Sequence, residues 1–169
     1  METLEPCPDC EALVAATRGP THRYLGASAG CWSVFNEIGA RSLMDPAYRA
    51  PHQTVVDTYA AQHPGKPGPQ AIQSVAGHLI SLHAQLEHGV TPAKAPVVLQ
   101  RALRERGVFH WIEPPSFAGV LNVLHVRTPD DADDYAARVR EWAEAVYAAW
   151  SLHHAQIAAW YEQHVVAGR

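Results

Sequence analysis

The stretch QAIQSVAGHLISLHAQLEHG, residues 70–89, decides the fold class. Its apolar residues recur every three or four positions, which is the spacing of one buried face of an α-helix. These residues are Ile72, Val75, Leu79, Leu82 and Leu86. Gly89 follows the last of them, in a position where glycine commonly ends a helix. The stretch therefore predicts an amphipathic helix that begins near Gln70.

Four more helical segments are predicted around it. One runs over about 28–44, and a second follows Pro51 and runs to His63, where the proline- and glycine-rich run 64–69 ends it. A shorter helix spans about 93–106. Aspartates at the end of the following loop favour a helix N-terminus, and the helix they open is predicted to be the longest and to run almost to the end of the chain.

The fold class expected is mainly α, a bundle of about five helices. Residues 108–127 show no clean period of either kind, so they are predicted to be a crossing loop with at most a short strand pair. A length of 169 residues suggests a single domain over 1–169. Within it we expect an irregular Cys/His cap over 1–30 and the helical bundle over 31–169.

The composition excludes several classes of protein. Hydrophobic residues make up 47% and charged residues 18%, which indicates a packed core, and a net charge of -4 with no basic cluster argues against nucleic acid as a partner. The chain has no long apolar run and no basic, apolar leader, so neither a membrane partner nor export is expected, and we predict a cytoplasmic protein. Eleven His and three Cys favour metal chemistry.

Cys7-Pro8-Asp9-Cys10 is a C-x-x-C knuckle, a spacing that brings two thiolates to one tetrahedral ion. Two further ligands are needed. His22 is the nearest histidine and Cys31 is the remaining cysteine, near the first turn of a predicted helix. The sequence thus predicts a Cys3His site of Cys7, Cys10, His22 and Cys31. Three thiolates and an imidazole are typical of structural zinc.

Other interpretations of these residues remain open. Cys31 is also consistent with a small buried hydrophobic residue, and His22 with a residue of a surface turn. A redox function of the C-x-x-C pair is a further alternative, although such pairs normally follow a strand and open a helix.

Several histidines of the predicted helices form a second, weaker candidate set for a metal site with an open coordination position. Its members are His63, His78, His153 and His154. Adjacent His153 and His154 point 100° apart on a helix, which argues against joint binding of one ion. Asp57, flanked by apolar residues, either faces solvent or orients a His or Arg from another helix.

The pattern of motifs resembles a bacterial family described only as a domain of unknown function. The motifs are CPxC (7–10), GPTHxY (19–24), GCW (30–32), VDxYxxQHPG (56–65), QSVxxHL (73–79) and WxxHH (150–154). This resemblance supports grouping the Cys and His residues but implies no reaction. A looser similarity is to the DNA-damage-inducible four-helix metalloproteins, whose helix-borne histidines bind a divalent ion.

Three functions are therefore consistent with the sequence. The first is a cytoplasmic zinc-binding helical protein whose Cys3His site is mainly structural. The second is a metal-dependent hydrolase or transferase that uses the helix histidines, and the third is a protein-binding module without catalysis. Whether the protein is an enzyme is left open by the sequence, as is any small-molecule substrate.

Overall fold

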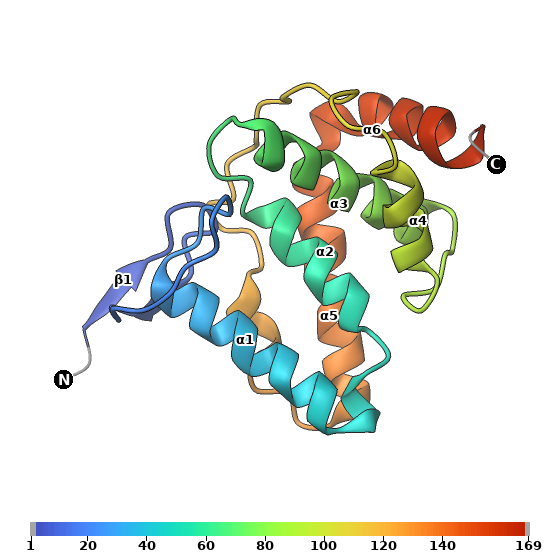
Figure 1. The fold of residues 1–169 in the computed structure, drawn as a ribbon. Coiled ribbons are helices and arrows are strands. Elements are labelled where there is room, and N and C mark those ends of the chain that lie inside the picture. Colours follow the sequence, from blue (N-terminus) through green and yellow to red (C-terminus); the bar gives the residue numbers. More distant parts are fainter. Residues whose placement is uncertain (1–2, 168–169) are drawn as a thin grey trace.

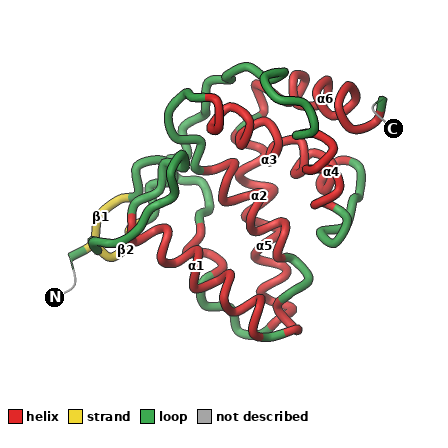
Figure 2. Tube along the Cα trace, in the orientation of Figure 1, coloured by secondary structure: helices red, strands yellow, loops and turns green. Residues whose placement is uncertain are grey.

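The computed structural model describes residues 3–167 and is mainly helical (Figures 1 and 2). The α-helices of this part of the chain are α1 (Ala29–Met44), α2 (His52–Gln62), α3 (Pro69–Glu87), α4 (Ala95–Ala102), α5 (Ala132–Ala149) and α6 (His154–Tyr161). Two short strands, β1 (Leu4–Pro6) and β2 (Leu13–Ala15), form an antiparallel pair in which Leu4 lies opposite Ala15. Short 3-10 helices cover Pro46–Tyr48, Val123–Val126 and Ser151–His153, and a π-helical turn covers Glu162–Val166.

Helix α3 lies at the centre of the bundle and packs against α2, α4, α5 and α6 (Figure 1). Its predicted apolar face is confirmed, because Val75, Leu79 and Leu82 are buried. Pro69 occupies the first turn, where its missing N–H costs no hydrogen bond. Beyond the helix end, Gly89 adopts a positive φ of 64°, as expected for a residue that stops a helix.

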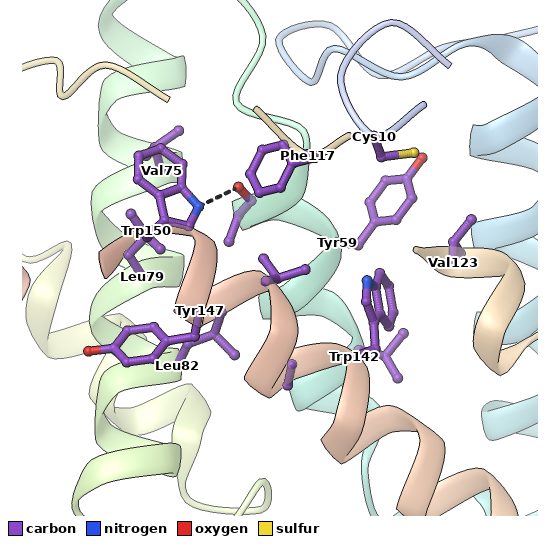
Figure 3. Packing of buried hydrophobic residues seen from close by; sticks show 14 of the residues in the cluster. Cys10, Tyr59, Val75, Leu79, Leu82, Phe117, Val123, Trp142, Tyr147 and Trp150 are labelled. Carbon is purple, nitrogen blue, oxygen red and sulfur yellow. Dashed lines mark hydrogen bonds between the residues drawn. The ribbon is translucent and has the colours of Figure 1, made fainter. Parts of the chain in front are cut away.

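Two tryptophans, Trp142 and Trp150, anchor the end of α2 (Figure 3). The indole N–H of Trp142 donates to the Gln62 side-chain oxygen (2.9 Å), and that of Trp150 donates to the Ala61 carbonyl (3.1 Å). Gln62 in turn donates to the Leu121 carbonyl at 2.8 Å. Gln62 and the two indole N–H groups are buried and paired, so the last turn of α2 is held in one position.

The C-terminal region differs from the sequence prediction. A single long helix was expected, but the structure ends α5 at Ala149 and starts α6 at His154, so α3 with 19 residues is longer than α5 with 18. The His154 imidazole donates to the Tyr147 carbonyl at 2.8 Å and stacks on the Tyr147 ring. The Tyr147 carbonyl also accepts from the Trp150 N–H at 3.0 Å, so the His154 ring adds a second hydrogen bond at the end of α5, where the chain leaves the helix axis.

The strand pair also lies elsewhere than predicted. It brackets the cysteine knuckle, so part of the predicted irregular cap is a hairpin, and residues 108–127 hold loops and the 3-10 helix Val123–Val126. The Asn122 side chain accepts from the Leu124 N–H at 3.1 Å and caps that short helix. Local capping of this kind competes with pairing into a sheet, which explains why an apolar run without alternation does not form strands.

Candidate metal centre

Four buried side chains, Cys7, Cys10, Cys31 and His63, bring their ligand atoms to within 4.8 Å of one another. The Cys10 and Cys31 sulfurs are 3.8 Å apart, and the Cys31 sulfur is 3.4 Å from His63 Nε2. Bond lengths of about 2.3 Å to sulfur and about 2.0–2.1 Å to nitrogen around a tetrahedral zinc ion give edges of about 3.8 Å and about 3.5 Å. The two measured edges therefore suit one tetrahedral ion.

The hairpin presents the first two sulfurs. Between β1 and β2 the Cys7 N–H donates to the Ala12 carbonyl at 2.9 Å, and the Glu11 N–H donates to the Cys7 carbonyl at 3.0 Å. Glu11 has a positive φ of 58°, a left-handed conformation that favours glycine. This turn curls the C-x-x-C segment so that the side chains of Cys7 and Cys10 point to the same side, into the protein.

Helix α1 supplies the third sulfur. Ser28 caps the helix, and its hydroxyl accepts from the Cys31 N–H at 3.3 Å. Cys31 thus lies in the first turn, where the unpaired N–H groups carry partial positive charge and favour a thiolate. The N-terminus of α1 suits the ligand electrostatically as well as geometrically.

Helix α2 supplies the imidazole from its C-terminal end. The Nδ1–H of His63 donates to the Tyr59 carbonyl at 2.7 Å, one turn back along the helix, which leaves the Nε2 lone pair directed at the sulfurs. The Tyr59 hydroxyl also donates to the Cys31 sulfur at 3.4 Å. Partners of this kind fix the tautomer and orientation of metal ligands.

Asp9, inside the knuckle, joins the hairpin to the turn that follows His63. Its carboxylate accepts from the Gly65 N–H at 2.8 Å, and Gly65 has a positive φ of 69°. Burial raises the pKa of the Asp9 carboxyl. The two central residues of C-x-x-C are often regarded as spacers, but here one of them positions the fourth ligand.

The electrostatics of the cluster favour a cation. Hydrogen bonds to Cys31 and Cys7, together with burial, raise the pKa of Cys10. Burial disfavours the charged ring of His63, yet contacts with the Cys31 and Cys7 sulfurs outweigh it and raise its pKa to about 9. Packed sulfurs cannot all carry negative charge without a positive partner, so in the absence of a metal the cluster retains protons that a metal would displace.

The structure does not place His22, the predicted fourth ligand, in the cluster. His22 lies outside the cluster, with its ring edge-on to Tyr24 and Trp32 at centroid distances of 4.4 and 5.2 Å, and His63 takes the place assigned to it. These edge-on contacts keep the His22 ring in the space lined by Trp32 and His78 and away from the cluster. The sequence predicts His63 only as a member of the weaker set of helix histidines, because sequence spacing contains no information on how α2 packs against the hairpin.

The remaining members of the second set do not come together in the described part of the chain. His78 pairs with Asp57, His153 donates to the Glu113 carbonyl at 2.8 Å, and His154 donates to the Tyr147 carbonyl. Each ring has a separate partner on a different element. The predicted open metal site of helix histidines is therefore not found among residues 3–167.

Asp57 follows one of the two alternatives left open by the sequence. Its side chain is fully buried, which excludes the solvent-facing one, and its carboxylate accepts from His78 Nδ1 at 2.7 Å. The histidine it orients lies on α3.

Comparison with known proteins shows the family of this chain. A model of the family of unknown function DUF5946 matches residues 5–151. The chain belongs to DUF5946. The matched region includes all four residues of the cluster, Cys7, Cys10, Cys31 and His63. No curated protein and no solved structure matches the chain. Within residues 3–167, no helix of this DUF5946 member has the length and apolar character needed to span a membrane.

Proposed function

We propose that this DUF5946 chain binds one zinc ion through Cys7, Cys10, Cys31 and His63, and that the ion has a structural role. The observation that supports this most directly is the geometry of the cluster: a sulfur pair at 3.8 Å and a sulfur–nitrogen pair at 3.4 Å, with all four residues buried. Three soft sulfur ligands and one imidazole are a donor set that zinc prefers.

Two features favour a structural over a catalytic ion. Four protein ligands complete a tetrahedron and leave no position for water or substrate. The four side chains are also 0–1% exposed, so a substrate has no path to the ion. The chemistry that zinc supplies here is cross-linking of the hairpin, the start of α1 and the end of α2.

The cross-link replaces an apolar core in this part of the molecule. The hairpin contributes few buried side chains besides the two cysteines, namely Ala12 and Val14. Because the unfolded chain does not hold a preformed site, the free energy of metal binding becomes free energy of folding. We therefore expect the N-terminal segment to depend on zinc for its place on the bundle.

Reduced cysteines also bear on the location of the protein. All three are free and buried, and the site requires them as thiolates. A compartment that keeps thiols reduced suits such a site, so we propose the cytoplasm.

Metal analysis of matched histidine variants tests the proposed ligand set. The purified protein is expected to hold about one equivalent of zinc by mass spectrometry of the metal, and His63→Gln is expected to hold much less. His22→Gln removes the histidine that is closer in sequence to the cysteines, and it should retain the metal. Thermal unfolding should fall sharply for His63→Gln and on chelation, since metal binding and folding are linked.

Two results would contradict the proposal. One is loss of zinc in His22→Gln with retention in His63→Gln, which would restore the ligand set predicted from the sequence. The other is metal-free protein that unfolds at the same temperature as metal-loaded protein.

A further inference from the structure

A second polar cluster lies away from the metal centre, around the carboxylate of Asp57 in α2. The carboxylate is fully buried and accepts four hydrogen bonds from side chains of α2 and α3. The donors are Gln53 Nε2 (2.9 Å), His78 Nδ1 (2.7 Å), Ser81 Oγ (2.6 Å) and Gln85 Nε2 (2.8 Å). A buried carboxylate held this firmly fixes the position of each donor.

His78 is the one donor of this cluster with a second functional nitrogen. Because the Nδ1–H group donates a hydrogen bond to Asp57, Nε2 of the neutral ring carries a lone pair. No hydrogen bond to Nε2 is formed within residues 3–167, and the side chain is 16% exposed. The result is an oriented acceptor that remains available to a bound molecule.

His78 lines a small cavity with aromatic walls. The cavity has a volume of about 120 Å³, and its aromatic lining residues are His22, Tyr24, Trp32, Phe35 and Tyr59. The Tyr59 ring is packed between Phe35 and His63, at centroid distances of 4.1 and 4.0 Å, so the apolar surface open to a ligand belongs mainly to the partly buried Trp32 and Phe35. The volume is below that of an engineered apolar cavity of about 150 Å³ that admits benzene, so a bound aromatic ring would extend into the groove next to the cavity.

Two further observations mark the cavity as a site for a ligand with polar groups. The Nδ1 atom of His22 is buried and has no hydrogen-bond partner in the described part of the chain, and His22 lines the cavity. An unpaired buried polar atom is costly, and a ligand group or a water that pairs with it removes the cost. A wider groove of about 750 Å³ shares the residues Tyr24, Ser74 and His78 with the cavity and provides an entry.

We propose that this cavity is a binding site for hydroxyl-bearing aromatic molecules of the phenol class, whose ring contacts Trp32 and Phe35 and whose hydroxyl donates to His78 Nε2. The Asp57 carboxylate strengthens Nε2 as an acceptor, because it stabilises positive charge on the imidazole. The site is separate from the metal centre but shares one wall with it, since Tyr59 also donates to the Cys31 sulfur.

The test compares two fluorinated probes that differ by one hydroxyl, using zinc-loaded protein. We expect 4-fluorophenol, followed by fluorine NMR, to bind about 3- to 10-fold more tightly than fluorobenzene, the effect of one additional hydrogen bond. The nitrogen-15 resonance of His78 Nε2 should shift on addition of 4-fluorophenol and stay in place with fluorobenzene.

The substitution His78→Asn tests the Nε2 acceptor separately from the hydrogen bond of Nδ1. Asn in His78→Asn retains an N–H near the position of Nδ1, which can still donate to Asp57, but it has no atom at the position of Nε2. We expect this variant to bind the two probes equally. His153→Asn changes a histidine that lines neither the cavity nor the groove and should keep the selectivity of the native protein.

Three outcomes would overturn the proposal. They are equal affinity of the native protein for both probes, no binding of either probe, and unchanged selectivity in His78→Asn. Should His78→Asn fail to fold, the nitrogen-15 shift in the native protein decides the question, because an unmoved His78 Nε2 signal in the presence of bound 4-fluorophenol contradicts the proposed hydrogen bond.

Discussion

At the scale of single residues, Tyr59 connects the candidate metal centre to the aromatic cavity. Its carbonyl orients the His63 ring, its hydroxyl donates to the Cys31 sulfur, and its ring lines the aromatic cavity. Since the carbonyl belongs to the backbone, substitution of the side chain separates the first contact from the other two.

Tyr59→Phe removes the hydroxyl alone and should weaken zinc binding without abolishing it. Loss of a partner of a metal ligand typically lowers affinity by about 10- to 100-fold, and His63 stays oriented through the Tyr59 carbonyl. Competition with a chelator of known affinity measures the change. Tyr24→Phe, at a partly exposed tyrosine without a contact to the cluster, is the control, and equal affinities of the two variants would refute the role of the hydroxyl.

Sequence spacing was sufficient to group the three cysteines but not to choose the histidine. Cys7 and Cys10 form a local motif, and Cys31 is the one cysteine left to join them. His22 is closer along the chain than His63, yet the choice depends on where α2 ends relative to α1. That position is fixed by residues far along the chain, such as Trp142 and Trp150, which donate hydrogen bonds to the last turn of α2.

Asp9 is a functional residue that sequence reasoning passed over. Its signal was present in CPDC, because a carboxylate next to ligating cysteines can hold a neighbouring N–H. What the sequence does not contain is the identity of that partner, Gly65, which is brought near only when α2 packs against the hairpin.

At the scale of elements, the hairpin rests on the start of α1 with little space between the backbones. A Cβ atom added at Gly30 would meet the carbonyl oxygen of Ala15 in β2 and the Val14 side chain. Gly39, further along the same helix, has no atom within 4 Å of an added Cβ. The two glycines thus differ in what they contact while sharing a helical backbone.

Gly30→Ala should lower the free energy of unfolding by about 1–3 kcal/mol, because the backbone of β2 must move to admit the methyl group. Gly39→Ala should raise it by about 0.5–1 kcal/mol, because alanine favours a helix more than glycine does. Urea unfolding of both zinc-loaded variants measures the difference. Similar effects of the two substitutions would show that the hairpin does not lie directly on Gly30.

Helices with a clear apolar period were predicted well, and elements set by local capping or by long-range contacts were not. The apolar face of α3 follows from its sequence, and α1 ends at Met44 as expected. The break after α5 depends on His154 turning back to the Tyr147 carbonyl, which periodicity cannot show. The strands β1 and β2 could not be predicted, because three residues are too few to display an alternating pattern.

At the scale of the whole molecule, we expect His83 to make the stability of the helical bundle depend on pH. His83 is 8% exposed, and its Nδ1 forms a hydrogen bond with the Tyr147 hydroxyl on α5 at 2.7 Å, while its Nε2 forms one with His88 Nε2 at 3.2 Å. Burial and the neighbouring His88 lower the pKa of His83 in the folded state.

Acid should therefore destabilise the bundle through His83. A histidine whose pKa is lower in the folded than in the unfolded state contributes stability above its unfolded pKa of about 6.5, and this contribution is lost as the pH falls below it. His83→Gln cannot titrate, so its free energy of unfolding should fall less between pH 7 and pH 5. Urea unfolding at these pH values, with zinc in excess for both proteins, measures the two slopes. Parallel slopes would exclude His83 as the source.

The order of the four ligands along the chain has a consequence for biosynthesis. All of them precede α3, the central helix, so a growing chain that has left the ribosome as far as Gly65 already carries every sulfur and nitrogen atom of the centre. Capture of the proposed zinc ion by the nascent polypeptide can thus precede completion of the bundle, and the hairpin can be tethered to α1 and α2 while the downstream helices are still being translated.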